Sequence, residues 1–128
     1  MRTPASRIAV FAAVLAAAAG QARTVAPPGT TVVAQTRTTV LENERVRAQV
    51  NDYPPGSKGP EHEHLVPRVV VVLQGGTLDI RGASGDVKTL HLEAGEVVWR
   101  PAEKHSIANP GTTAVRVVEI DLKDCPAR

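Results

Sequence analysis

Aromatic residues are nearly absent from this chain. Its 128 residues include one Tyr, one Trp and one Phe, which leaves almost no aromatic surface on which nucleic-acid bases could stack. The core must therefore be aliphatic. Valine dominates the candidate strands, and its branched β-carbon suits a pleated sheet. This composition gives no support for a nucleic-acid binder and favours a small β-protein.

Cysteine is equally scarce. Cys125 is the only cysteine, so no disulfide can form within one chain. It stands in Asp124-Cys125-Pro126, close to the C-terminus, where chains are usually loosely held. The sequence therefore disfavours both a disulfide scaffold and a cysteine nucleophile.

Helical periodicity is also missing. Outside the first 22 residues, no segment repeats apolar residues every 3.6 positions. Short runs instead alternate apolar and polar residues, as at 46–51 and 77–81, and proline- or glycine-rich turns separate them. Eight to ten short strands at this spacing predict an all-β sandwich or barrel.

The expected strands cover most of one domain, placed at residues 34–122. It follows a flexible lead-in at 23–33 and precedes a C-terminal tail at 123–128. His91 alternates with Leu90 and Leu92, so it is expected to face solvent. The strands are expected at 31–36, from 40, and at 46–51, 69–73, 77–81, 87–92, 97–100, 105–108 and 114–122, with loops at 53–60 and 101–104.

The first 22 residues have the pattern of a secretory signal peptide. Arg2 and Arg7 precede an uncharged run at 8–19, and small residues follow it. The run has 12 residues, whereas a membrane-spanning helix needs about 20. We expect cleavage, a secreted or periplasmic location and no membrane attachment afterwards; retention as an anchor is the alternative. Without these two arginines the chain has 13 basic and 13 acidic residues, so the pI near 9.0 gives no support for nucleic-acid binding.

Residues 69–73 read Val-Val-Val-Val-Leu, which is apolar on both faces of a strand. A strand of this kind is covered on both sides. We expect the second cover to be another copy of the chain, giving a homodimer, with the N-terminal segment as the alternative.

Three histidines form the candidate site. His62 and His64 stand two residues apart, so in a strand their imidazoles would lie side by side. His105 follows about forty residues later, in a second stretch rich in turn residues. Neutral imidazole suits Zn, Cu, Fe and Ni, and three histidines leave positions open for water or substrate. Hydrogen-bonded histidines without a metal are the alternative.

The spacing of these residues resembles the two motifs of the cupins, a family of small jelly-roll β-barrels. The first motif places His-x-His five residues after a glycine and ends on a second glycine. The second motif places proline five residues after a glycine, and then a histidine three residues before an asparagine. The resemblance spans roughly 34–122 and implies that His62, His64 and His105 hold a divalent transition metal: Fe, Mn, Ni or Zn. The matching residues are Gly56, His62, His64 and Gly75, then Gly95, Pro101, His105 and Asn109.

Two positions depart from that pattern. The turn after Pro101 is one residue short, with Glu103 in place of a glycine, and the glutamate ligand of the first motif is replaced by Arg68, or by Val69 with the longer spacing. A guanidinium about 5 Å from a divalent cation would cost roughly 6–7 kcal/mol at an effective dielectric of about 20. Arg68 is therefore expected to swing away, to replace the metal, or to pair with an acid. The candidate acids are Glu61, Glu63, Glu103 and Glu119, of which alternation disfavours Glu63.

Several functions fit this pattern. The resemblance implies a metal-dependent enzyme similar to the small cupin dioxygenases and isomerases, with catalytic residues not identified. The alternative is a non-catalytic cupin that binds a small anionic or apolar ligand without metal. Arg68 would then be the charge partner, because a guanidinium can hold a carboxylate or phosphate with two hydrogen bonds. A dimer without chemistry is a third reading. Trp99 and Tyr53 are candidate substrate contacts at the cavity mouth, or ordinary packing residues.

Overall fold

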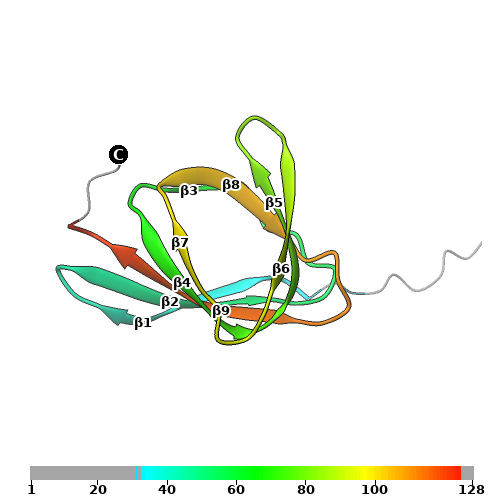
Figure 1. The fold of residues 1–128 in the computed structure, drawn as a ribbon, viewed down its shortest axis with the longest axis horizontal. Coiled ribbons are helices and arrows are strands. Elements are labelled where there is room, and N and C mark those ends of the chain that lie inside the picture. The colour runs from blue at the N-terminus through cyan, green and yellow to red at the C-terminus, as the bar shows by residue number, and fades with distance from the viewer. Residues whose placement is uncertain (1–30, 32, 125–128) are drawn as a thin grey trace, which may run out of the picture.

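Two antiparallel β-sheets face each other across the interior (Figure 1). The computed structural model describes residue 31 and residues 33–124. The expected signal peptide, nearly all of the lead-in and Cys125 lie outside these residues. The described part is entirely strand, turn and loop, which confirms the all-β prediction, and it contains no helix able to cross a membrane.

The chain passes repeatedly from one sheet to the other. The five-stranded sheet has the order β1–β2–β9–β4–β7, and the four-stranded sheet has the order β3–β8–β5–β6. The first consists of β1 (Thr36–Glu42), β2 (Val46–Tyr53), β9 (Val115–Leu122), β4 (Arg68–Gln74) and β7 (Val97–Arg100). The second consists of β3 (His62–His64), β8 (Glu103–Ala108), β5 (Gly76–Gly82) and β6 (Val87–Leu92).

Several predicted boundaries differ from the structure, and strand pairing explains two of them. The strand expected at 31–36 begins only at Thr36, and β1 continues as one element through 40–41, with a register shift between Thr39 and Leu41. β8 starts at Glu103 rather than at His105, because Glu103 pairs with His64. In both cases the pairing partner fixes the strand ends, and local propensity does not.

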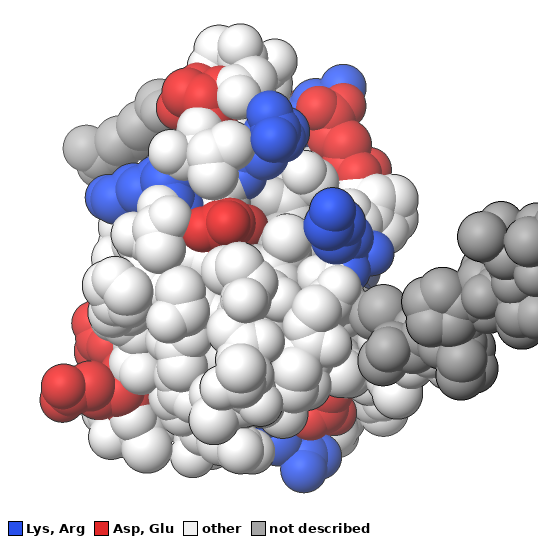
Figure 2. Space-filling view, turned by 90° about the vertical axis from the view of Figure 1, so that its right-hand side faces the viewer, with Lys and Arg blue, Asp and Glu red and all other residues white. Residues whose placement is uncertain are grey.

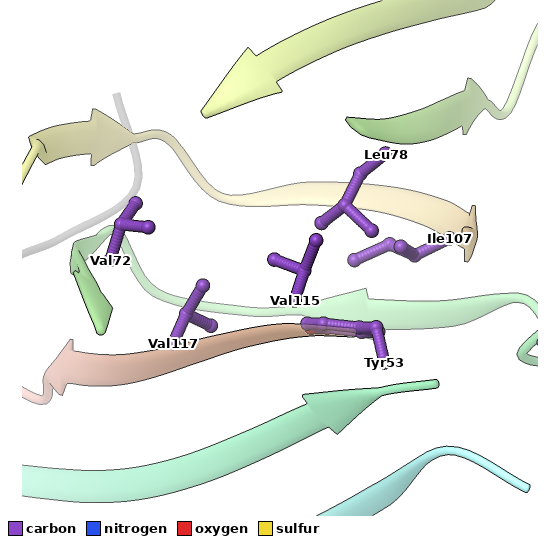
Figure 3. Close-up of a cluster of buried hydrophobic side chains, with 6 residues drawn as sticks. All are labelled: Tyr53, Val72, Leu78, Ile107, Val115 and Val117. Atoms are coloured by element: carbon purple, nitrogen blue, oxygen red, sulfur yellow. The ribbon is translucent and has the colours of Figure 1, made fainter. Parts of the chain in front are cut away.

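The apolar core is small and contains residues from both sheets. Figure 3 shows Leu78 and Ile107 of the four-stranded sheet meeting side chains of the five-stranded sheet. The remaining members are Tyr53, Val72, Val115 and Val117. Burial alternates along β9, where Val115 and Val117 point inward and Arg116 points out.

The rest of the interior is polar. Among the described residues, nine polar or charged residues are buried, more than the six that form the apolar core. They include His64, Arg68, His105, Glu119 and Asp121. Burying a polar group costs free energy unless the group is paired. The polar part of the interior is therefore the candidate location of a functional site.

Charged side chains do not form a single basic patch on the face drawn in Figure 2. Basic and acidic side chains are mixed and lie mainly toward its margins, with a broad uncharged area between them. This face therefore lacks the one-sided positive field that phosphate backbones require.

Asn109 joins the end of β2 to the turn before β9. It is 1% exposed, and its Nδ2 donates to the carbonyl oxygens of Tyr53 and Thr113, each at 2.8 Å. Its Oδ1 accepts from the backbone N–H of Gly111 at 2.9 Å. Three hydrogen bonds on one buried side chain hold together segments more than fifty residues apart.

We expect Asn109→Asp to destabilise the protein by about 2–4 kcal/mol, because it removes both N–H donors and leaves two carbonyl groups facing a carboxylate. Urea unfolding of the two proteins measures the difference. Asn43→Asp is the matched control: Asn43 uses only Oδ1, which accepts from the backbone N–H groups of Arg45 and Val46, and aspartate keeps that acceptor. Equal losses in both variants would contradict this account.

Candidate metal centre

The three candidate histidines meet at one point of the interior. β3 pairs with β8 so that His62 lies directly opposite His105, and His64 is two residues further along the same face. The ring centroids are 4.8 to 5.1 Å apart. One ring nitrogen from each histidine lies within 4.8 Å of the others, and the Nε2 atoms of His62 and His64 are 3.1 Å apart.

Each Nδ1 faces an oxygen on the outer side of the cluster. His62 Nδ1 is 3.1 Å from the carbonyl oxygen of Pro60. His64 Nδ1 is 4.0 Å from Asp121 Oδ1, and His105 Nδ1 is 3.4 Å from Glu103 Oε1. Metal-ligating histidines usually have such an oxygen behind the ring, which fixes its orientation and tautomer.

The cluster leaves buried polar atoms without partners. Neither nitrogen of His105 makes a hydrogen bond within the protein, and Asp121 Oδ1 also lacks one. An unpaired buried polar group costs about 1–3 kcal/mol. A cation bound by the imidazoles would satisfy one of the two unpaired nitrogens of His105, so the donor set fits a divalent transition metal.

Burial keeps the two inner histidines neutral. Burial, together with the nearby charge of Arg68, lowers the pKa of His64 to about 3. Burial likewise lowers the pKa of His105 to about 4, although the carboxylate of Glu103 opposes that shift. At neutral pH both rings therefore carry the free lone pair that a metal requires.

Arg68 is buried and paired with two acids. It is 1% exposed; it donates to Glu103 Oε1 at 2.9 Å and to the Pro101 carbonyl at 3.0 Å. Its Nε lies 3.6 Å from Glu119 Oε1. Two of the four candidate acids are therefore its partners. The others are not: Glu61 pairs with Lys104 at 2.8 Å, and Glu63 is exposed.

Arg68 does not continue the strand of His62 and His64. Treating 62–68 as one unbroken strand would put Arg68 on the face of His62 and His64 by simple alternation. The structure separates them, because β3 ends at His64 and β4 begins in the other sheet at Arg68. Arg68 reaches the interior from the opposite wall.

Glu103 faces inward but is occupied by two arginines. Arg100 donates to both of its oxygens at 3.0 Å, and Arg68 donates to one of them. Burial alone would raise the pKa of Glu103, but the charge of Arg100 and the hydrogen bond from Arg68 lower it overall. This carboxylate lies 3.4 Å from His105 Nδ1 and neutralises the arginines, and it is not free to act as a fourth ligand.

The two aromatic candidates lie in different places. Tyr53 is buried and lines the interior cavity together with Arg68 and His105. Burial raises its pKa, and the charge of Glu119 adds to the effect. Trp99, in contrast, is 57% exposed. Since Val98 and Arg100 line the cavity, alternation along β7 turns Trp99 to the outer surface.

A further residue at the cluster is Arg37, which the sequence did not single out. Its Nη2 lies 3.2 Å from His62 Nε2. An open groove of about 240 Å³ runs beside it, bordered by residues that include Arg37, Asn51, Tyr53 and His62. Only the β1–β2 pairing brings Arg37 here, and no local motif in the sequence marks it.

Comparison with known proteins found similarity among solved structures. Searches with protein-family models and among curated proteins found no match. A cupin superfamily protein from Desulfitobacterium hafniense shares 24% identity over 70% of this chain and 78% of its own, with a TM-score of 0.54. The polyketide cyclase RemF from Streptomyces resistomycificus shares 17% identity, covers 72% and 67% of the two chains and has a TM-score of 0.56.

A third structure is more similar in sequence. A cupin domain from Bordetella pertussis is 31% identical over 74% of this chain and 99% of its own, with a TM-score of 0.67. This chain also has the two-sheet jelly roll and the histidine spacing of both motifs, with His62 and His64 on one strand and His105 opposite them. The chain belongs to the cupin superfamily.

Proposed function

We propose that this protein is a metal-dependent cupin in which His62, His64 and His105 hold one divalent transition metal (Fe, Mn, Ni or Zn). The reaction would be dioxygenase- or isomerase-like and would act on a small molecule. One observation carries the proposal: three imidazoles converge with acceptor oxygens behind their rings, and His105 has no hydrogen-bond partner of its own. The metal, when bound, supplies Lewis-acid or redox chemistry and a site for substrate or water.

The protein's own residues prepare that site. Asp121 stands behind His64 and is held by Arg47, which donates to Oδ2 at 2.7 and 3.0 Å. Glu103 stands behind His105 and is held by Arg100 and Arg68. These contacts hold the two carboxylates in place before a metal arrives, while burial keeps the rings of His64 and His105 neutral.

The alternative, a metal-free cupin that binds an apolar or anionic ligand inside the barrel, has less support. The interior cavity measures about 50 Å³, whereas a cavity that holds benzene measures roughly 150 Å³. Arg68 would also have to leave Glu103 and Glu119 before it could hold an anion.

Metal analysis tests the proposed site. We expect the purified protein, reloaded anaerobically with Fe(II) or with Zn(II) and dialysed, to retain about one metal ion per chain by plasma mass spectrometry. His64→Gln should retain less than a tenth of that, because it removes a ligand. His91→Gln is the control, since His91 is exposed and bonds only Thr77 among the described residues. Wild-type protein that retains no metal would refute the proposal.

We further propose a homodimer formed through the outer face of the five-stranded sheet. Trp99, Val97 and Leu41 are at least half exposed there, and strand pairing aligns apolar residues across the face in two rows. One row is Leu41, Ala48, Ile120, Val69 and Trp99, and the other is Val50, Val118, Val71 and Val97. Apolar area of this continuity is typical of interfaces.

Sedimentation velocity tests the dimer. We expect wild-type protein to sediment as a dimer at micromolar concentration, and Trp99→Glu to raise the dissociation constant at least tenfold by placing a charge in the interface. Val87→Glu introduces the same charge at an exposed valine of the other sheet and should leave the dimer intact. A monomeric wild type would rule this assembly out.

We also propose export, on the sequence pattern of residues 1–22 alone. When the full chain is expressed in a bacterium with a periplasm, the intact mass of the periplasmic product should lack that segment. Recovery of the uncleaved chain from the cytoplasm alone would contradict export.

A further inference from the structure

We infer that Arg37, rather than Arg68, is the anion-binding residue of this site, and that its ligand is a small carboxylate bound jointly by the metal and by Arg37. The inference rests on the proposed metal site and specifies which class of ligand completes it. The groove beside His62 would hold the carboxylate.

Arg37 and a metal compete for the same atom. His62 Nδ1 faces the Pro60 carbonyl at 3.1 Å and donates its proton there, so Nε2 carries the single free lone pair. Arg37 Nη2 lies 3.2 Å from this Nε2 and donates to it. One lone pair cannot both accept this hydrogen bond and bind a cation. Metal binding therefore releases the guanidinium of Arg37 from His62.

Once released, Arg37 carries an unbalanced charge. Among the described residues, no carboxylate lies within 4.0 Å of its guanidinium, whereas the other arginines of the site pair with Asp121 or Glu103. Arg68 is also buried to 1% exposure and already has three oxygen neighbours. Of the two candidate clamps, only Arg37 is free to take up an external anion.

The groove has the size and polarity for such a ligand. Its volume is about 240 Å³, several times that of the interior cavity, and it borders both Arg37 and His62. Asn51, which is 1% exposed, also lines it, and its Oδ1 has no partner. A carboxylate with a neighbouring hydroxyl offers an anion for Arg37, oxygens for the metal and a donor for Asn51.

The wall of the groove is held firmly. Gln35 donates through Nε2 to the Ile107 carbonyl at 3.0 Å and to Ser57 at 3.3 Å. A side chain at Gly59 would collide with Gln35. The groove is therefore preformed beside the start of β1. Arg37 is the one cationic side chain among the described residues that line it, and a single positive charge matches a monoanion.

The inference is tested by measuring the binding of Co(II) and then of glycolate. Calorimetry and the visible absorption of Co(II) report both binding steps. We expect Arg37→Ala to bind Co(II) alone about 3–10 times more tightly, because the competing donor is gone. We expect the same variant, loaded with Co(II), to bind glycolate at least ten times more weakly. Arg37→Lys keeps the positive charge but cannot donate two parallel hydrogen bonds as a guanidinium does. Its affinities should therefore lie between those of wild type and Arg37→Ala.

Two controls separate the charge of Arg37 from general effects. Arg45→Ala removes an exposed arginine that pairs with Asp124 next to the β1–β2 turn and should change neither affinity. Glycolamide, the neutral counterpart of glycolate, should bind weakly and equally to wild type and Arg37→Ala.

The outcomes distinguish this inference from the metal proposal. If Co(II) binds wild type but glycolate binds Arg37→Ala as tightly, Arg37 is not the clamp and only this inference fails. Equal binding of glycolate and glycolamide overturns it in the same way. If Co(II) does not bind wild type at all, the metal site and this inference fail together.

Discussion

The pairing of Arg68 with Glu103 and Glu119 is the interaction on which the site depends. Arg68 comes from β4 of one sheet, Glu103 from β8 of the other, and Glu119 from β9 beside β4, so the guanidinium ties the two walls of the barrel together. Removing one member of a buried charge group costs several kcal/mol, because the remaining charges lose their compensation. Since Glu103 also approaches His105, the same network sets the position of a candidate ligand. Arg68 is therefore better described as a structural residue that links the two sheets than as a substitute for a metal ligand.

The interior divides into an apolar part that supports folding and a polar part that supports chemistry. Six buried apolar residues form the core, and a domain of this size has little stability to spare. The polar part is tolerable only because Arg47, Arg68 and Arg100 are matched by Asp121, Glu119 and Glu103. Neutral histidines in the same region add no further charge. Charge balance thus permits the protein to hold an open, unsatisfied cluster inside a small barrel.

The residues themselves explain what the sequence could and could not predict. Alternation at 46–51, 77–81 and 87–92 is a local signal, and strands β2, β5 and β6 form there. In β2, however, the polar residues Gln49 and Asn51 are the buried ones, so alternation predicted the strand but not which face points inward. The histidine spacing is also local once the two motifs are seen, and it located the cluster. The separation of His64 from Arg68 and the approach of Arg37 depend on strand pairing between distant segments, which no short window encodes. Trp99 is a different case. If it had been known that Arg100 points inward, alternation along β7 would have predicted that Trp99 points to the outer surface.

The replaced glutamate changes the electrostatics of the site more than its geometry. In the cupin pattern this chain resembles, a carboxylate joins the histidines and offsets part of the cation's charge. Here the proposed ligand set is three imidazoles, and the acids nearest to it are already matched by arginines. A divalent ion in this site would keep its full charge, in surroundings where the effective dielectric is low enough for that charge to matter. An anionic exogenous ligand is then favoured over a neutral one on electrostatic grounds alone. Because the glutamate of the cupin pattern is absent here, the proposed site would favour an exogenous ligand that carries a carboxylate.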